Sequence, residues 1–380
     1  MDLDGRSPAR TARAEQVSDV VDVIRGANAA REAVVLRGGG TALSIGDAPE
    51  RYDVCLDLRG LSGVVRYEPD DLVVTVRAGT TLGELAAVLA AHRQRWPVET
   101  GAPDRATVGG VLASAAIGPS RLRYFHPRDW TIGVQAVLGD GTLTRAGGHV
   151  VKNVTGYDLT KLYAGSFGTL CAMTELSLKL AALPERTLTL RMEAPSLEHA
   201  YVEARSLIAR GLPLDALAVL HGPPAEAFGA ASWTGLWVRL AGSTRVVERL
   251  RQEVSARKPF VVEESDVWPR LARLPVEADL SLRLAWPAGS LEPHPGDRGG
   301  LLYPGLEAMH VFGIEDADEL RALRIALESK GGALIVKRAP AELRRAVGTW
   351  GTPRSPERIG RELKARFDPN GVLAPGRLAF

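Results

Sequence analysis

Cysteine is scarce in this chain of 380 residues, which contains only Cys55 and Cys171, each beside apolar residues. Iron–sulfur clusters are usually held by four cysteine thiolates, so this chain cannot hold one alone. We expect both cysteines to be small core residues and not a disulfide pair. Long apolar runs are also absent, since no segment approaches the roughly 20 apolar residues that a membrane-spanning helix requires.

Several binding signatures are missing as well. No Gly-x-x-x-x-Gly-Lys-Ser/Thr phosphate loop and no Gly-x-Gly-x-x-Gly fingerprint occurs, which argues against ATP-binding and Rossmann-type proteins. The seven histidines lack the close spacing of paired metal ligands, so we expect no metal site. The net charge of +2 comes from scattered residues, which gives nucleic-acid binding little support.

The overall composition is that of a globular protein, with 45% hydrophobic and 24% charged residues. Its length favours two domains over a single core. Residues 1–13 carry charges of both signs without a central apolar run, which argues against a secretory signal and favours a cytoplasmic location.

Strands and helices mix in the first part of the chain. Apolar residues from Val20 to Ala27 have helical spacing, and a short strand is expected at Val34–Arg37. Thr81 and Glu84 form a capping box that predicts the start of another helix. An Asp-Gly turn at Gly139–Gly141 predicts a hairpin between Val134–Leu138 and Thr142–Arg145.

After Pro184 the pattern becomes simpler, with strands and helices that predict an α+β layer of antiparallel strands with helices on one face. A last helix is expected from Pro356 to Arg366, followed by a turn-rich tail.

Three segments are rich in glycine. Leu36–Gly46 follows a strand and contains three consecutive glycines, which lets backbone N–H groups converge on an anion. Thr100–Ser114 has a glycine pair ahead of small residues, which suits a helix start against a flat or anionic group. Lys152–Leu170 has glycines at 156, 165 and 168. Taken singly, each segment is explained as well by a flexible loop, tight helix packing or turn chemistry.

Together, in this order and separation, the three segments resemble the FAD-binding (PCMH-type) domain of vanillyl-alcohol-oxidase-like and hydroxyacid-oxidizing flavoproteins. Lys152–Leu170 is especially similar to the FAD-binding E subunit family of bacterial glycolate oxidase, and the tail with Asp368–Gly371 and Pro375–Arg377 resembles that family's closing motif. The resemblance implies an N-terminal extension (1–13), a two-subdomain FAD-binding domain (14–183), a ferredoxin-like α+β substrate or cap domain (184–355), and a C-terminal segment (356–380) that returns to the FAD domain.

The resemblance also implies a set of FAD-binding residues. It places Arg37, Gly38, Gly39, Gly40, Thr41 and Ser44 around the pyrophosphate; Thr107, Gly109, Gly110 and Ser114 along the pyrophosphate and flavin; and Gly156, Tyr157, Asp158, Gly168, Thr169 and Leu170 near the cofactor. Covalent members of the wider family have a histidine directly after the glycine run. This chain has Thr41 there, so we expect non-covalent FAD.

The activity that the resemblance implies is oxidation of a small 2-hydroxy acid, such as glycolate to glyoxylate, by hydride transfer to flavin. Electrons would pass to a separate iron–sulfur subunit in a complex that also holds a homologous FAD-linked subunit. The resemblance also allows the complex to bind peripherally at the inner face of the membrane. Two alternatives remain open: a self-sufficient 2-hydroxy acid dehydrogenase, and an FAD-binding assembly subunit without substrate chemistry.

The sequence does not single out a catalytic base or a cation for the substrate carboxylate. His310 is followed by no second histidine, unlike the paired-histidine motif of related dehydrogenases, and we interpret it as a packed strand-end residue. His126 lies in a basic, aromatic loop that we interpret as solvated. Exposed tryptophans, with Trp233, Trp237 and Trp268 as candidates, are expected to form an apolar surface for partner subunits.

Overall fold

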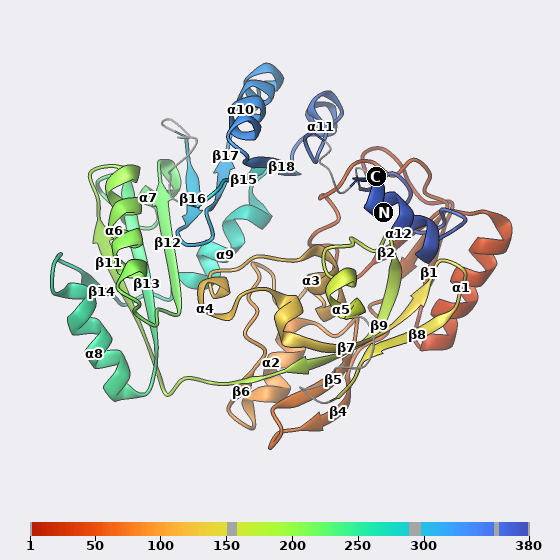
Figure 1. Cartoon of the computed structure of the whole chain (residues 1–380), viewed down its shortest axis with the longest axis horizontal. Helices are drawn as coiled ribbons and strands as arrows, with labels where there is room; N and C mark the ends of the chain where they lie inside the picture. The colour runs from red at the N-terminus through yellow and green to blue at the C-terminus, as the bar shows by residue number, and fades with distance from the viewer. Residues whose placement is uncertain (1, 150–157, 289–297, 353–356, 379–380) are drawn as a thin grey trace.

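The computed structural model describes residues 2–149, 158–288, 298–352 and 357–378. The chain forms two halves around separate sheets (Figure 1). The first half contains strands β1 to β10, and the second contains strands β11 to β18. No helix among these residues is long and apolar enough to cross a membrane.

The first half begins with a small parallel sheet in the order β1-β3-β2, formed by Arg10–Arg13, Val54–Asp57 and Val34–Arg37. Helix α1 (Val17–Ala30) buries its expected apolar stripe against this sheet. Strand β1 pairs with β3 over its whole length, so regular structure starts inside the segment expected to be an extension. This strand escaped prediction because its four residues, Arg-Thr-Ala-Arg, have no apolar alternation.

A five-stranded antiparallel sheet forms the rest of the first half, in the order β4-β5-β9-β7-β8. Its strands are Val64–Glu68, Val73–Arg77, Cys171–Lys179, Thr131–Leu138 and Leu143–Gly147. The helices and short elements around it are α2 (Leu82–Ala90), α3 (Val108–Ser114), α4 (Arg121–Tyr124), η1 (Pro127–Trp130), α5 (Leu159–Tyr163), β6 (Gln94–Arg95) and β10 (Ala181–Ala182). The expected hairpin is formed by β7 and β8, and the expected capping box closes the start of α2.

The second half is one eight-stranded antiparallel sheet in the order β14-β11-β13-β12-β16-β17-β15-β18. In chain order the strands are Arg186–Glu193, Ala216–His221, Thr234–Gly242, Val261–Glu263, Ser281–Ala285, Gly300–Tyr303, Ala308–Phe312 and Ala333–Arg338. Its helices are α6 (Leu197–Ala209), α7 (Pro223–Ala227), α8 (Thr244–Ser255), α9 (Trp268–Glu277), α10 (Ala317–Ser329) and α11 (Ala341–Val347).

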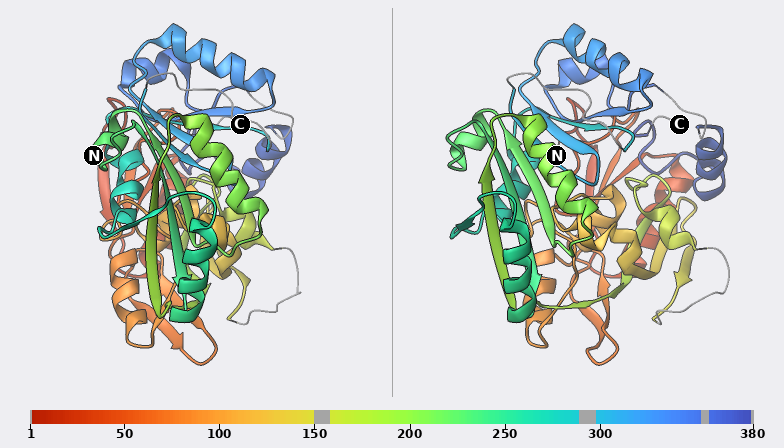
Figure 2. Two further views of the ribbon diagram at one scale, coloured as in Figure 1. Left: turned by 90° about the vertical axis from the view of Figure 1, so that its left-hand side faces the viewer. Right: turned by 60° about the vertical axis from the view of Figure 1, so that its left-hand side comes forward.

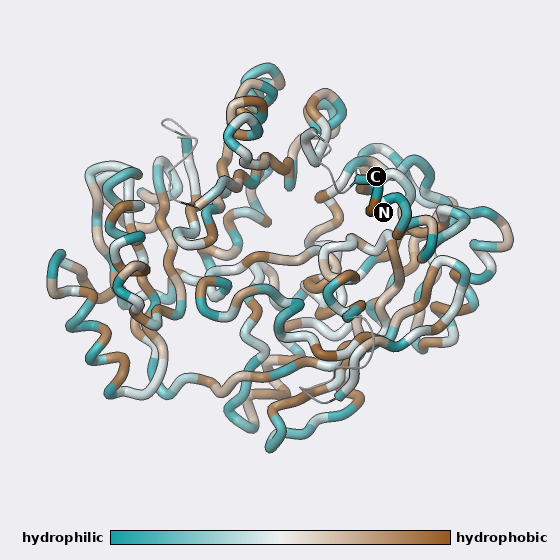
Figure 3. The backbone as a smooth tube through the Cα atoms, in the orientation of Figure 1, coloured by the Kyte–Doolittle hydropathy of each residue, from teal (hydrophilic) through white to brown (hydrophobic). Residues whose placement is uncertain are grey.

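Helices cover both faces of this sheet, which corrects the expectation of one covered face. Helices α6, α8 and α10 bury their apolar side chains on the outer face; in the left panel of Figure 2, α6 and α8 lie toward the viewer and α10 lies along the top. Helices α7 and α9 pack on the inner face. Strand β12 shows why helices pack on both faces, because it carries apolar side chains on both. Leu217 and Val219 point outward, whereas Ala218 and Leu220 point inward. The hydropathy trace in Figure 3 shows the resulting concentration of apolar residues in the central strands.

The C-terminal segment returns to the first half, as expected. After α12 (Glu357–Phe367), the Val34 N–H donates to the Val372 carbonyl at 2.7 Å, and the Ala374 N–H donates to the Val34 carbonyl at 2.8 Å. The buried Asp368 carboxylate accepts hydrogen bonds from the N–H groups of Val372 and Leu373. The two bonds of Val34 attach the end of the chain to β2, which is an edge strand of the small parallel sheet.

Candidate functional site

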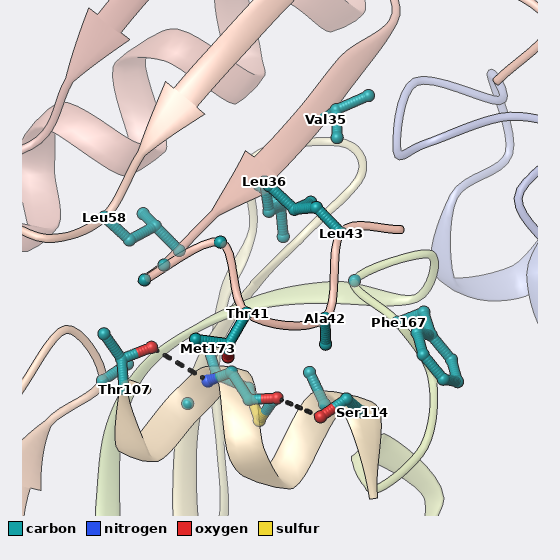
Figure 4. Close-up of a pocket in the computed structure, with 18 of the residues that line it drawn as sticks. Val35, Leu36, Thr41, Ala42, Leu43, Leu58, Thr107, Ser114, Phe167 and Met173 are labelled. Carbon is teal, nitrogen blue, oxygen red and sulfur yellow. Dashed lines mark hydrogen bonds between the residues drawn. The ribbon is translucent and has the colours of Figure 1, made fainter. Parts of the chain in front are cut away.

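A pocket opens where β2, α3 and the tail meet, and it encloses about 790 Å³ including space open to solvent. This size lies within the usual range for small-molecule and cofactor sites. Its lining combines glycine backbone with apolar side chains, and Figure 4 shows several of these converging from separate elements. The lining residues are Val35, Leu36, Gly38, Gly39, Gly40, Thr41, Ala42, Leu43, Leu58, Ala78, Thr107, Gly109, Gly110, Ala113, Ser114, Phe167, Gly168, Cys171, Met173 and Arg377.

The glycine triplet is required for reasons that differ along its length. A Cβ on Gly39 would lie 1.6 Å from the Arg105 carbonyl oxygen, and one on Gly38 would lie 2.3 Å from Thr107 Oγ1. These two glycines therefore let the loop pack directly against the second segment. Gly40 has a positive φ of 78°, so it forms the turn itself. Thr41 follows with its side chain at the pocket wall.

The second segment supplies the floor of the pocket through α3. Thr107 caps this helix, and its hydroxyl accepts a hydrogen bond from the Gly110 N–H at 3.2 Å. The Ser114 hydroxyl donates to the Gly110 carbonyl at 2.8 Å, as Figure 4 shows. A Cβ on Gly109 would lie 2.8 Å from that of Ala78, so this glycine allows α3 to approach the end of β5.

Of the described residues of the third segment, only some line the pocket. Gly168 lines it together with Phe167, which sequence reasoning had not singled out. Thr169 and Leu170 are buried outside the pocket lining, and the Thr169 hydroxyl donates to the Ser166 carbonyl. Asp158 forms a 2.9 Å ion pair with Lys161 away from the pocket. Gly156 and Tyr157 lie outside the described residues.

Two expected residues of the first segment do not line the pocket. The Ser44 hydroxyl donates to the Lys337 carbonyl at 3.1 Å, so it connects the loop to strand β18. Arg37 is not part of the lining, and its buried Nε lacks a hydrogen-bond partner in the described part of the chain.

Arg377, from the closing motif, enters the lining instead. Its guanidinium donates to the carbonyls of Leu43 at 2.8 Å and Asp47 at 3.1 Å, and also to that of Ile45. Burial, followed by the neighbouring Arg344, lowers the pKa of Arg377 to about 10. The tail thus supports the loop that carries the glycine triplet. Every residue has a backbone carbonyl, so the sequence does not indicate which carbonyls accept hydrogen bonds from Arg377.

A group of basic side chains lies on the inner face of the second sheet. Arg283 on β15, His310 on β17 and Lys337 on β18 are neighbours there, with Arg283 directly opposite His310 in the ladder. His310 is therefore buried within a strand and is not a strand-end residue as expected. Sequence reasoning missed Arg283 and Lys337 because they lie more than 50 residues apart and only strand pairing unites them.

Two other expectations change with the structure. His126 is half-buried and caps η1, where its Nδ1 accepts a hydrogen bond from the Arg128 N–H at 3.2 Å. Burial lowers its pKa to about 4, with contributions from Arg121 and Arg128, so this residue is not a solvated loop side chain. Trp237 and Trp268 are buried, at 0% and 3% exposure, which removes them from any docking surface; Trp233 is 41% exposed.

Comparisons with known proteins agree with this architecture. Residues 8–147 match the family model of an FAD binding domain. Over 330 residues the chain is 31% identical to glycolate oxidase subunit GlcE of Escherichia coli (strain K12), covering 85% of this chain and 86% of the relative. The chain belongs to the family of glycolate oxidase subunit GlcE. As a member of this family it is an FAD-binding protein of the oxidoreductase class, which confirms the expected cofactor.

Other members of the wider group match over shorter stretches. D-lactate dehydrogenase of Archaeoglobus fulgidus (strain ATCC 49558 / DSM 4304 / JCM 9628 / NBRC 100126 / VC-16) is 33% identical over 182 residues, which is 48% of this chain and 41% of that protein. The solved structure of p-cresol methylhydroxylase with substrate bound superimposes with a TM-score of 0.72 at 15% identity, covering 97% of this chain and 88% of that one. This likeness confirms the expected fold class.

Proposed function

We propose that this protein is the FAD-binding subunit of a glycolate-oxidase-like complex, in which a small 2-hydroxy acid is oxidised and electrons pass to an iron–sulfur subunit. The observation that carries this proposal is the similarity to GlcE over 85% of this chain and 86% of that subunit. The match to D-lactate dehydrogenase supports the same substrate class, because D-lactate is also a small 2-hydroxy acid.

We further propose that the pocket holds FAD, with Gly38, Gly39, Gly40 and Thr41 around the pyrophosphate. Thr107, Gly109, Gly110, Ser114 and Gly168 would extend the site along α3 and the third segment. The glycine backbone suits an anionic group, and so does the absence of acidic side chains from the lining among the described residues. FAD would supply the hydride acceptor, while this chain would orient it, exclude water with Phe167 and Met173, and bind the substrate.

The assignment of FAD to this pocket implies that the two halves of the chain are separate domains with different roles. We propose that residues 14–183 form the FAD-binding domain, that residues 184–355 form a cap over it, and that the segment 356–380 completes the first domain. The return of residues 368–377 to β2 and to the glycine-rich loop supports this division.

We expect FAD to be held without a covalent bond. Thr41 occupies the position after the glycine run, and Cys171, the only thiol in the described lining, is buried, which raises its pKa and keeps it protonated. Acid precipitation of the purified yellow protein should therefore release flavin into the supernatant. Colour that remained in the pellet would contradict this prediction.

We expect the isolated chain to turn over glycolate or D-lactate slowly or not at all with a dye acceptor. The chain has two cysteines, both buried, so it provides no cluster to carry electrons away from the flavin. Adding the homologous FAD-linked subunit and the iron–sulfur subunit should restore activity in a steady-state assay. Equal rates with and without those subunits would show a self-sufficient dehydrogenase. A flavin that stays oxidised in the assembled, turning-over complex would show an assembly role.

A further inference from the structure

The basic group on the inner face of the second sheet contains no acidic side chain. Arg283 faces His310 across the β15–β17 ladder, and Lys337 follows Val336, whose side chain packs in the outer core. All three side chains therefore point away from α10 and toward the first half of the protein. No ion pair involves any of them among the described residues, and both Arg283 Nε and His310 Nδ1 are buried without a hydrogen-bond partner.

The pKa shifts of Lys337, Arg283 and His310 are those of a basic cluster without a neighbouring acidic side chain. Burial and then Arg283 lower the pKa of Lys337 to about 8, and burial and then Arg121 lower the pKa of Arg283 to about 10. Burial, Lys337 and Arg283 hold the pKa of His310 well below its ordinary value, so this imidazole is neutral. Buried charges are normally paired, because desolvation without a partner is costly. A cluster kept without one points to a ligand that brings the opposite charge.

The position of the cluster connects it to the FAD-binding half. Ser44, which follows the pocket-lining residues Gly38–Leu43, donates to the Lys337 carbonyl at 3.1 Å, and Arg344 donates to the Ser44 carbonyl. On the other side, Arg121 is close enough to Arg283 to lower its pKa, and it follows α3 by only a few residues. The cluster thus lies between two segments that adjoin the pocket.

We propose that Arg283, His310 and Lys337 form a binding site for the carboxylate of a small organic acid. Arg283 and Lys337 neutralise the carboxylate, and the neutral His310 supplies a ring nitrogen that accepts a hydrogen bond from a neighbouring hydroxyl group. The anion site follows from the two partly buried charges of Arg283 and Lys337 beside the buried His310. Only the identification of the bound carboxylate as the substrate rests on the proposed function. If that function holds, this subunit binds substrate in the complex.

The test measures oxalate binding to the FAD-loaded chain by isothermal titration calorimetry and by the change in flavin absorbance. Arg283→Met and Lys337→Met remove the charges with little change in volume, and each should weaken oxalate binding about 10- to 100-fold, the usual range for a lost charged hydrogen bond. Arg338→Met is the matched control, because Arg338 is the next residue on β18 and is exposed. Its oxalate affinity should equal that of the unaltered protein.

Thermal unfolding of the oxalate-free proteins provides a second readout. Lys337→Met should raise the melting temperature while it weakens binding, because it removes a partly buried charge that has no ion-pair partner among the described residues. A merely structural lysine would give the opposite shift. Oxalate should raise the melting temperature of the unaltered protein and have little effect on either variant.

The pH dependence has a definite sign. Lys337 is protonated below about pH 8, and a bound carboxylate stabilises that form, so oxalate affinity should fall as the pH rises above about 8. Arg283 and Arg121 stay charged in this range, and His310 and His126 stay neutral. Lys337→Met should therefore flatten the profile between pH 7 and 9.

Three outcomes would overturn the proposal. These are no oxalate binding to the unaltered protein, unchanged affinity in both variants, and loss of FAD together with oxalate binding, which would assign the cluster to a cofactor phosphate. A different result would separate the two proposals. If the variants lose oxalate binding but the chain shows no activity in any assembly, the anion site stands and only the proposed function is rejected.

Discussion

Aspartate in place of Thr41 should leave the purified protein nearly free of FAD, whereas asparagine should leave most of the flavin bound. Thr41 lines the pocket and has an ordinary backbone conformation, so neither substitution strains the loop. Two like charges about 4 Å apart at an effective dielectric constant near 20 repel by about 4 kcal/mol, which corresponds to roughly a thousandfold loss of affinity. The FAD dissociation constant, measured by fluorescence titration of the flavin-free proteins, checks this result.

The pair of substitutions at position 41 isolates charge from shape. Asparagine has the same size as aspartate, so equal melting temperatures of the two flavin-free variants would show that the loop is intact in both. Retention of FAD by the aspartate variant would reject the pyrophosphate assignment. Gly39 is less suitable for this purpose, because any Cβ there meets the Arg105 carbonyl and disturbs the loop for steric reasons.

Replacing Arg239 by methionine should destabilise the protein by about 3–5 kcal/mol, the usual cost of breaking a buried ion pair. Arg239, on β13, forms a 2.7 Å ion pair with the buried Asp215 and a 2.8 Å ion pair with Glu99, and it donates to Ser120 Oγ at 2.8 Å. Glu99 and Ser120 belong to the first half, so this network joins the two halves. Chemical denaturation should show the loss directly.

An exposed pair provides the control. Arg249→Met removes an ion pair with Glu253 on the surface of α8, where both side chains are at least 40% exposed, and it should change stability by at most about 1 kcal/mol. Similar losses in both variants would show that the Arg239 network contributes no more than a surface pair. If Arg239→Met does not fold, Arg239→Lys keeps the charge and provides a milder measurement.

The same network predicts an acid dependence. Burial raises the pKa of Glu99, but Arg239 and hydrogen bonds from Ser120 outweigh this effect and hold the pKa below 4.5. Because the folded-state pKa is lowered, the contribution of Glu99 is complete above pH 4.5 and is lost as the pH falls through the lower folded-state value. In Arg239→Met the uncompensated burial raises this pKa, so the stability difference between the two proteins should shrink in acid.

Some features of the fold were predictable because they are local. The capping box at Thr81, the Asp-Gly hairpin and the apolar stripe of α1 depend on residues within a few positions of one another. Short elements without such signals were missed, including β1 and α9. Helix α9 escaped prediction because Pro275 interrupts the helical spacing of its apolar residues. Packing against the inner face of the sheet stabilises the helix in spite of this proline.

For the site, the amino-acid sequence was enough to predict FAD, through the family resemblance of the three glycine-rich segments, and the parts of the pocket that lie within single segments. The expected residues that line the pocket are Gly38, Gly39, Gly40, Thr41, Thr107, Gly109, Gly110, Ser114 and Gly168, because glycine and small residues at a turn allow only a few backbone arrangements. The residues that lie opposite them could be identified only from the folded chain. The returning tail brings Arg377 to the loop, and strand pairing brings Arg283, His310 and Lys337 together from separate strands. Contacts of this kind depend on the register of distant strands, and a basic residue at a single position does not reveal whether it faces water, a carboxylate or a ligand.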